Sequence, residues 1–279
     1  MFLDKKAQFF SLPLNIAHRG VRSLAPENTI AASRMALEIG ADLWEFDVQV
    51  TCDKKLIVIH DDTLSRTSNV RMVFPNRKPW LVRDFTLKEI RGLDFGSWYN
   101  SSDPFGQIAA GNVPQKDQKS YIGELAPSLR EALEFTKKNN WRANIEIKNI
   151  PFSAERMKMI KKITNLVEEF GMEEEVIISS FDHEYLTWVK KLNSDVTTGV
   201  LVDEPLDNPA KYLNTIGADF YHPKASAINS EIIGSLWRQG YKVNVWTVND
   251  ERLMLELIDT VVSGIITDFP QRLKTISMR

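Results

Sequence analysis

Short apolar runs alternate with longer amphipathic segments along most of the chain. The apolar runs predict nine β-strands, at 14–18, 43–50, 56–60, 143–148, 176–181, 198–202, 219–222, 243–248 and 264–268. Between most of them, apolar residues recur at helical spacing and predict helices at 27–39, 128–139, 153–170, 183–193, 207–216, 228–239 and 250–260. A strand followed by a helix, repeated many times, is typical of a parallel sheet with helical crossovers.

The strands at 43–50 and 56–60 break this order, because only the residues TCDKK separate them. A parallel connection needs about a dozen residues or more, so these two strands must form an antiparallel hairpin. Without the return strand, eight parallel strands remain, which is the number that closes a barrel. The 279 residues suit one such barrel plus a modest insertion. We therefore expect a (β/α)8 TIM barrel, with an open doubly wound α/β sheet as the alternative.

Residues 62–123 interrupt the rhythm of strands and helices. The segment is rich in aromatic residues, Pro, Gly and Asn, and it shows one short helical pattern, TLKEIRGLD. A stretch of this length without regular structure is commonly an inserted lid or cap. We expect a barrel domain made of 1–61 and 124–279 and a small inserted domain at 62–123. Its aromatic residues are expected to form a small core of its own, in preference to an apolar rim for the substrate: Phe95, Trp98, Tyr99 and Phe105.

Composition and charge narrow the possible functions. Hydrophobic residues make up 43% and charged residues 26%, which predicts an ordinary globular core. The formal net charge of -2 argues against a nucleic-acid-binding surface and favours small-molecule partners. The single cysteine, Cys52, cannot form an intrachain disulfide and suits a reducing compartment. Because the N-terminus has no run typical of a signal peptide and no 18 apolar residues occur together, we expect a soluble, cytoplasmic protein without a transmembrane segment.

Charged residues inside the predicted strands indicate a metal site. Glu45 and Asp47 are two positions apart, so their side chains leave the same face of the strand, and the same holds for Glu146 and Lys148. The intervening residues are apolar and would face the helices, so the charged ones would point toward the barrel axis. Three buried carboxylates are costly unless a cation neutralises them, and oxygen ligands favour Mg²⁺ or Ca²⁺ over zinc. A plain buried ion pair between Glu146 and Lys148 is the alternative for those two residues.

Two histidines are expected beside these carboxylates. If the turn is centred in TCDKK, His60 lies opposite Asp47, and His18 and Arg19 end the neighbouring first strand. Imidazole titrates near neutral pH and can serve as a general base or a general acid, whereas Arg19 and Lys148 are the residue types that hold phosphate. Active sites of such barrels lie at the carboxyl ends of the strands, where these residues fall. The arrangement predicts cleavage of a phosphodiester.

Other polar residues near strand ends receive simpler interpretations. We expect His222 to form part of the pocket wall and His183 to be a surface residue. Trp246 is expected to face the barrel mouth, where it either contacts the substrate or fills the core. Thr267 and Asp268 are expected to position the last loop rather than to react.

Sequence motifs occur in a fixed order over nearly the whole chain: AHRG (17–20), PENT (26–29), GADLWEFDVQVT (40–51), VIHDDTLSRTS (58–68), IEIK (145–148), ISSF (178–181), VWTVN (245–249) and IITDFP (265–270). In these motifs the chain resembles the glycerophosphodiester phosphodiesterase family. The resemblance implies a barrel with a small inserted domain after the hairpin. It also implies hydrolysis of glycerophosphodiesters to sn-glycerol 3-phosphate and an alcohol, with one divalent cation.

The resemblance also implies a role for each matching residue: Glu45, Asp47 and Glu146 bind the metal, His18 and His60 act as base and acid, Arg19 and Lys148 hold the phosphate, and Trp246 packs against the substrate. One departure is that the family often has Asp-Gly at the hairpin turn, where this chain has DKK. Lysine tolerates a positive φ poorly, so a longer turn is expected here.

Two further functions remain as alternatives. A lysophospholipase D-like enzyme acting on lipids could use the same barrel, and it would need an apolar channel for the lipid. A non-catalytic phosphate-binding protein is the other alternative, and the presence of both histidines and all three carboxylates argues against it.

Overall fold

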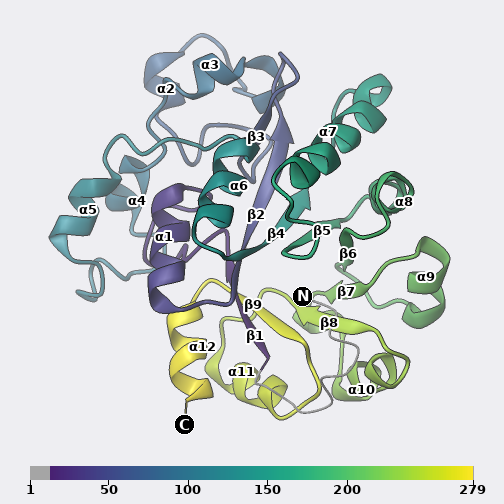
Figure 1. Ribbon diagram of the computed structural model, residues 1–279. Helices are drawn as coiled ribbons and strands as arrows, with labels where there is room; N and C mark the ends of the chain where they lie inside the picture. The colour runs from purple at the N-terminus through teal and green to yellow at the C-terminus, as the bar shows by residue number, and fades with distance from the viewer. Residues whose placement is uncertain (1–12, 279) are drawn as a thin grey trace.

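Nine strands form one sheet in residues 13–278, the part of the chain that the computed structural model describes. The strands are β1 (Leu14–His18), β2 (Leu43–Val50), β3 (Leu56–Val58), β4 (Arg142–Ile147), β5 (Val176–Ser180), β6 (Thr197–Val202), β7 (Phe220–Pro223), β8 (Lys242–Val245) and β9 (Gly264–Thr267). Their order is β1-β9-β8-β7-β6-β5-β4-β2-β3, and β1 also pairs with β2, so the sheet closes on itself (Figure 1). Only β3 pairs in the antiparallel sense. The predicted (β/α)8 TIM barrel is confirmed, and closure excludes the open sheet.

Helices connect successive parallel strands and cover the outside of the barrel (Figure 1). Those that were predicted are α1 (Ile30–Ile39), α6 (Leu129–Lys138), α7 (Arg156–Glu169), α8 (His183–Leu192), α9 (Pro209–Ile216), α10 (Ser230–Arg238) and α11 (Glu251–Ile258). The last helix, α12 (Pro270–Ser277), was not predicted, because its apolar face beyond Pro270 consists only of Leu273 and Ile276. Short 3-10 turns lie at η1 (Val82–Asp84), η2 (Ser153–Glu155) and η3 (Ala225–Ala227).

The interior of the barrel is apolar toward the amino ends of the strands and polar toward their carboxyl ends. Side chains from five strands form an apolar cluster inside it: Ile16, Leu43, Ile177, Phe220 and Ile266. Residues of the opposite parity, such as Trp44 and Phe46, pack outward against the helices. Charged residues therefore enter the barrel only beyond the apolar cluster, toward the carboxyl ends of the strands.

The register of the hairpin differs from the expected one. Val48 pairs with Val58, and the N–H of Ile59 donates to the carbonyl of Asp47 at 2.9 Å, so Ile59 and not His60 lies opposite Asp47. The reason is a turn with an odd number of central residues, in which Lys54 adopts a left-handed φ of 57°. Since β3 ends at Val58, His60 lies in the loop that follows the strand.

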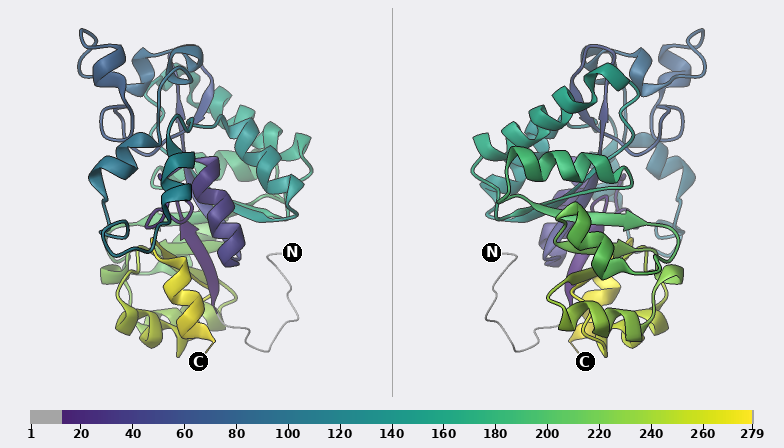
Figure 2. Two further views of the ribbon diagram at one scale, coloured as in Figure 1. Left: turned by 90° about the vertical axis from the view of Figure 1, so that its left-hand side faces the viewer. Right: turned by 90° about the vertical axis from the view of Figure 1, so that its right-hand side faces the viewer.

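The segment 62–123 contains four short helices: α2 (Val70–Val73), α3 (Leu87–Ile90), α4 (Ser97–Ser102) and α5 (Gln115–Tyr121). It lies on the side of the barrel that carries α1, and its part around α2 and α3 projects beyond the end of the barrel (Figures 1 and 2). Only α3 coincides with the helical pattern found in the sequence.

The aromatic residues of this segment do not form one core. Phe95 belongs to a small cluster with residues such as Trp80 and Phe85. Tyr99, in contrast, packs with the core of the barrel, and so does the partly buried Trp98. Phe105 lies edge-on to Phe269, with ring centres 5.5 Å apart. The expected separate core was therefore right for Phe95 and wrong for the other three, because α4 and α5 pack on the core of the barrel and the loop between them brings Phe105 against Phe269.

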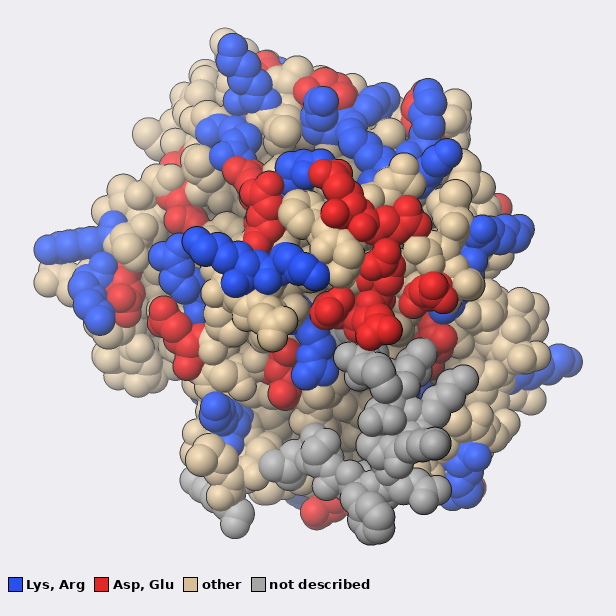
Figure 3. Space-filling model, in the orientation of Figure 1, with Lys and Arg blue, Asp and Glu red and all other residues tan. Residues whose placement is uncertain are grey.

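The surface and the chain ends add two observations. On the face seen in Figure 3, a group of acidic side chains lies near the centre among scattered lysine and arginine side chains, so this face does not carry the continuous basic surface that nucleic-acid binding needs. Within residues 13–278, none of the helices combines the length and the apolar character needed to cross a membrane. The expectation about a signal peptide concerns residues 1–12, which lie outside the described residues.

Candidate active site

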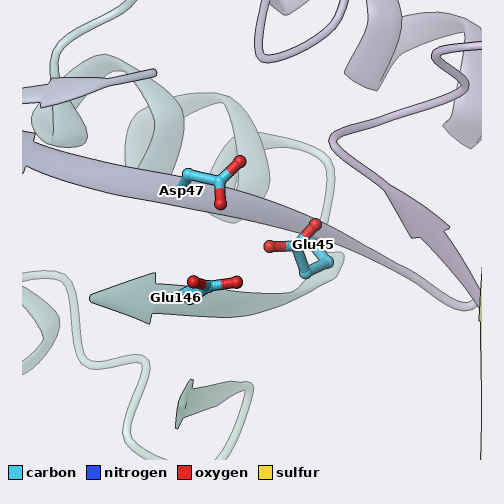
Figure 4. A group of neighbouring side chains, drawn as sticks. All are labelled: Glu45, Asp47 and Glu146. Atoms are coloured by element: carbon cyan, nitrogen blue, oxygen red, sulfur yellow. The ribbon is translucent and has the colours of Figure 1, made fainter. Parts of the chain in front are cut away.

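Three carboxylates meet inside the barrel at its carboxyl end. Glu45 and Asp47 come from β2 and Glu146 from β4, where Asp47 and Glu146 are neighbours in the register. Each can offer one oxygen such that all three oxygens lie within 4.8 Å of one another. Figure 4 shows the three side chains pointing toward a common space. We call these residues the three-carboxylate group.

Burial and mutual repulsion perturb this group. Burial, together with the charges of Asp47 and Glu146, raises the pKa of Glu45 well above its usual value. Burial and the charge of Asp47 also raise the pKa of Glu146. Burial opposes ionisation of Asp47 as well, but nearby cations, Arg19 foremost, outweigh it and lower its pKa. The group thus concentrates negative charge that a bound cation would relieve.

The free oxygens of the group fit a hard cation. Asn28 donates to Oδ2 of Asp47 at 2.8 Å, and the N–H of Arg19 donates to Oε2 of Glu45 at 3.0 Å. The remaining oxygens, Oδ1 of Asp47 and Oε1 of Glu45, are buried and have no hydrogen-bond partner among the described residues. In Glu45 and Asp47, one oxygen is therefore fixed by a hydrogen bond, while the other accepts none from the described residues and is left for a ligand. Oδ1 of Asp47 also lies 3.6 Å from Nζ of Lys148. Such oxygen donors suit Mg²⁺ or Ca²⁺.

His18, at the end of β1, is held by a carboxylate from the far end of the chain. Its Nδ1 lies 2.6 Å from Oδ1 of Asp268, and its Nε2 lies 3.9 Å from Oε2 of Glu45. Because an ionised carboxylate only accepts, Nδ1 carries the proton and Nε2 faces the three-carboxylate group. Burial, followed by the charge of Arg19, lowers the pKa of His18.

Asp268 itself is fixed by the last loop. Its Oδ2 accepts a hydrogen bond from Asn249 at 2.7 Å, while the hydroxyl of Thr267 donates to Oδ1 of Asn249 at 3.2 Å. The two residues do order the last loop, as expected, but Asp268 additionally orients His18.

His60 is held in the same way as His18. Its Nδ1 lies 2.8 Å from Oδ1 of Asp61, the next residue in the loop after β3. Its side chain is about one third exposed, more than that of His18. The site thus contains two imidazoles, each with a carboxylate behind it.

Two cationic side chains border the carboxylates. Arg19 adopts a positive φ of 55°, and its guanidinium donates to Glu27 at 2.9 Å and lies 3.3 Å from Asp47. Nζ of Lys148 lies 2.7 Å from Glu146 and 3.6 Å from Asp47. The ion pair between Lys148 and Glu146 is therefore present, and it belongs to the larger cluster around the three-carboxylate group.

A cavity of about 210 Å³ connects these residues. The charged part of its lining comes from β1, β2 and β4 and from the residues that follow β1, β3 and β4: His18, Arg19, Glu45, His60, Glu146 and Lys148. The apolar part comes from β6 and β9 and from the residues that directly follow β5 and β8: Phe181, Leu201, Trp246 and Ile266. The Trp246 indole donates to the carbonyl of His222 at 2.7 Å and lies edge-on to Phe181. A ligand in this cavity would meet charges on one side and apolar groups on the other.

The other two histidines differ from their expected roles. His222 is fully buried and bonded to Asn244 at 3.1 Å; it lies outside the cavity lining, and burial lowers its pKa to about 3. His183 is half-buried, and its ring nitrogens bond the hydroxyl of Tyr212 and the carbonyl of Leu201. Neither the pocket-wall prediction for His222 nor the surface prediction for His183 was correct, because both rings fill gaps between strands or helices.

Comparison with known proteins identifies the family. Residues 18–272 match the Glycerophosphoryl diester phosphodiesterase family. The chain belongs to this family. It is therefore an enzyme of the phosphoric diester hydrolase class, as the motifs predicted.

Relatives of this family match over almost the whole chain. A glycerophosphodiester phosphodiesterase of Caldanaerobacter subterraneus subsp. tengcongensis is 37% identical over 262 residues, which cover 93% of this chain and 96% of the relative. A glycerophosphodiester phosphodiesterase of Bacillus altitudinis is 34% identical over 260 residues, which cover 92% of this chain and 94% of the relative. Among solved structures, a phosphodiesterase of Oleispira antarctica in complex with the product sn-glycerol-3-phosphate is 26% identical, with a TM-score of 0.81 and coverage of 96% and 98%.

Sequence reasoning alone missed several residues of the candidate site. Glu27 and Asn28 lie in the PENT motif and bind Arg19 and Asp47, while Asp61 follows His60 directly. Their presence in the quoted motifs was the available signal. Their contacts could not be predicted, because each joins elements that the sequence alone does not place together.

Proposed function

We propose that this enzyme hydrolyses glycerophosphodiesters to sn-glycerol 3-phosphate and an alcohol, in a reaction that depends on a divalent cation. The main support is a single arrangement. Two histidines, each held at Nδ1 by a carboxylate, share one cavity with the three-carboxylate group. The related phosphodiesterase of Oleispira antarctica, whose structure contains sn-glycerol-3-phosphate, agrees with this choice of product.

The proposed cation is one Mg²⁺ or Ca²⁺ ion held by Glu45, Asp47 and Glu146. When bound, it would neutralise negative charge on the phosphate and stabilise the charge that develops during attack. Arg19 and Lys148, which line the same cavity, would hold the phosphate oxygens through charge-assisted hydrogen bonds. The two free carboxylate oxygens described above support this assignment.

The two histidines are proposed as the base and the acid. Nε2 of His18 would accept the proton of the glycerol hydroxyl beside the phosphate as its oxygen attacks phosphorus, and His60 would donate a proton to the leaving alcohol oxygen. Water would then open the resulting cyclic phosphate to give glycerol 3-phosphate. Asp268 and Asp61 would keep each ring in the correct tautomer and would stabilise its cationic form. Trp246 would pack against the carbon atoms of the substrate.

We also propose that the barrel consists of 1–61 and 124–279 and that 62–123 is a small inserted domain. All residues that line the cavity belong to the barrel part. Selection among head groups would then depend on the apolar wall formed by Phe181, Leu201 and Trp246 rather than on the insertion.

Cleavage of lysophospholipids is the second candidate. The apolar wall favours it, because Phe181 is 42% exposed beside Trp246 and could meet an acyl chain. The volume of about 210 Å³ favours the first candidate, since it suits a small ligand.

The test is release of glycerol 3-phosphate by the purified protein from glycerophosphocholine and glycerophosphoethanolamine and, in parallel, release of choline from lysophosphatidylcholine, whose other product would be lysophosphatidic acid. Activity should disappear in EDTA and return with Mg²⁺ or Ca²⁺. The His60→Ala variant should retain its fold and lose about two to four orders of magnitude in kcat. Activity that persists unchanged in EDTA would contradict the metal assignment, and cleavage of the lysolipid alone would favour the second candidate.

A further inference from the structure

Arg66, at the start of the segment 62–123, lies behind the active site and outside the cavity lining. Its guanidinium binds both carboxylate oxygens of Glu27, at 2.9 Å and 2.7 Å. It also binds both oxygens of Asp61, at 2.6 Å and 2.8 Å. A single side chain therefore bridges the PENT motif and the loop that carries His60.

Each of these carboxylates holds a residue of the site. Oδ1 of Asp61 lies 2.8 Å from Nδ1 of His60, and Oε1 of Glu27 accepts from Arg19 at 2.9 Å. Glu27 is only 5% exposed, so its charge depends on the arginines around it. Arg66 is thus linked to the proposed proton donor His60 through one side chain, Asp61. It is linked to the proposed phosphate ligand Arg19 through another, Glu27.

The β1–α1 loop (residues 19–29) needs such support. Arg19 and Asn28 have positive φ angles of 55° and 59°, which are uncommon for residues other than glycine and persist only where the surroundings impose them. Within this loop, the N–H of Asn28 donates to the carbonyl of Arg19, and its side chain donates to Asp47. Displacement of the loop would therefore move both Arg19 and the amide that fixes Asp47.

Other residues of the segment contact the same loop. The hydroxyl of Tyr99 donates to the carbonyl of Ser23 at 2.5 Å, and that of Tyr121 donates to the carbonyl of Leu24 at 2.9 Å. Neither tyrosine lines the cavity. The segment thus contacts the β1–α1 loop without contributing these side chains to the cavity wall.

We propose that Arg66 is a positioning residue of the phosphodiesterase reaction, which orients His60 through Asp61 and fixes the β1–α1 loop through Glu27. The segment 62–123 thereby contributes to the rate of the reaction without contacting the substrate. This inference rests on the proposed role of His60.

The test compares Arg66→Met and Arg66→Lys with Arg77→Met. Arg77 is a matched control, because it lies in the same segment, is similarly exposed at 36% against 39%, and forms an ion pair with Glu89. Arg66→Met should lower kcat about 10- to 100-fold, the usual effect of removing a residue that orients a functional group, with a smaller change in KM. Arg66→Lys should recover part of the loss, because it restores the charge but not the two-sided guanidinium fork. Arg77→Met should leave kcat within twofold of the unmodified protein.

A double-mutant cycle with His60→Ala separates orientation from general damage. If Arg66 acts through His60, Arg66→Met should lower kcat by a several-fold smaller factor in the His60→Ala background than in the unmodified protein. An equal cost in both backgrounds, or kcat values for both Arg66 variants that match the Arg77 control, would overturn the inference. Full activity of His60→Ala by itself would instead refute the proposed role of His60.

Discussion

Replacing Asp268 by Asn tests whether a carboxylate behind His18 contributes to the rate. The substitution keeps the size of the side chain but removes the charge that lies 2.6 Å from Nδ1 of His18. An amide can also donate to Nδ1, which would leave the proton on Nε2, the nitrogen that faces the three-carboxylate group. Asp268→Asn therefore affects both the stability of the cationic ring and the choice of tautomer.

The magnitude follows from the hydrogen bond that is lost. A hydrogen bond to a charged group contributes about 1.5–3 kcal/mol, and each 1.36 kcal/mol of activation free energy changes the rate about tenfold. Loss of the charge alone should thus lower kcat about 10- to 150-fold. If the wrong tautomer is also fixed, the loss can reach about 10⁴-fold, as when the Asp of a Ser-His-Asp triad becomes Asn.

The assay is kcat for glycerophosphodiester hydrolysis at saturating substrate and cation. Asp219→Asn is the matched control, because Asp219 accepts from the N–H of Thr198 at 2.8 Å and pairs with Lys190 at the amino end of β7, the end opposite the site. Circular dichroism and thermal unfolding check that both variants fold. A kcat for Asp268→Asn within twofold of that of the control would refute the role assigned to Asp268.

Three further predictions concern the cation and the β1–α1 loop. Glu45→Gln should weaken binding of Mg²⁺ or Ca²⁺ at least tenfold by titration calorimetry, and an unchanged affinity would move the cation to other residues. In EDTA, the free energy of unfolding should fall as the pH rises through the raised pKa values of Glu45 and Glu146, because the folded state binds more protons there. Added cation should make the free energy of unfolding depend less on pH. Urea titrations at several pH values would contradict the assignment if the pH dependence were the same in EDTA and with added cation. Gly20→Ala should destabilise the protein by about 2–4 kcal/mol in urea unfolding, since a Cβ would lie 2.7 Å from Ala32 at a φ of +76°; a change under about 0.5 kcal/mol would be inconsistent with that contact.

The main features of the fold could be predicted from local patterns. Strand alternation placed Glu45 and Asp47 on one face and Trp44 and Phe46 on the other, because successive side chains of a strand leave opposite faces. The short TCDKK connection identified the hairpin, and the remaining strands gave the number that closes a barrel. These inferences depend only on neighbours in the sequence.

The register of the hairpin and the position at which β8 ends were harder to predict from the sequence. Whether Ile59 or His60 faces Asp47 depends on a single residue in the turn, since a shift by one reverses every side chain. Trp246 lies beyond β8, which ends at Val245, although its pattern continues the strand. Such details depend on turn geometry and on pairing with neighbouring strands.

The sequence by itself determined the barrel, the family and the residue types of the site, because periodicity, chain length and motifs are local properties. Only the tertiary structure decided which charged residues from distant segments meet at His18 and at Glu27. Asp268 reaches His18 across 250 positions because β9 closes the barrel against β1, and Arg66 reaches Glu27 across 39 positions because the loop after β3 returns to the β1–α1 loop. Ion pairs of this kind depend on distances of a few ångströms, which arise only when strand closure and helix packing bring distant segments of the chain together.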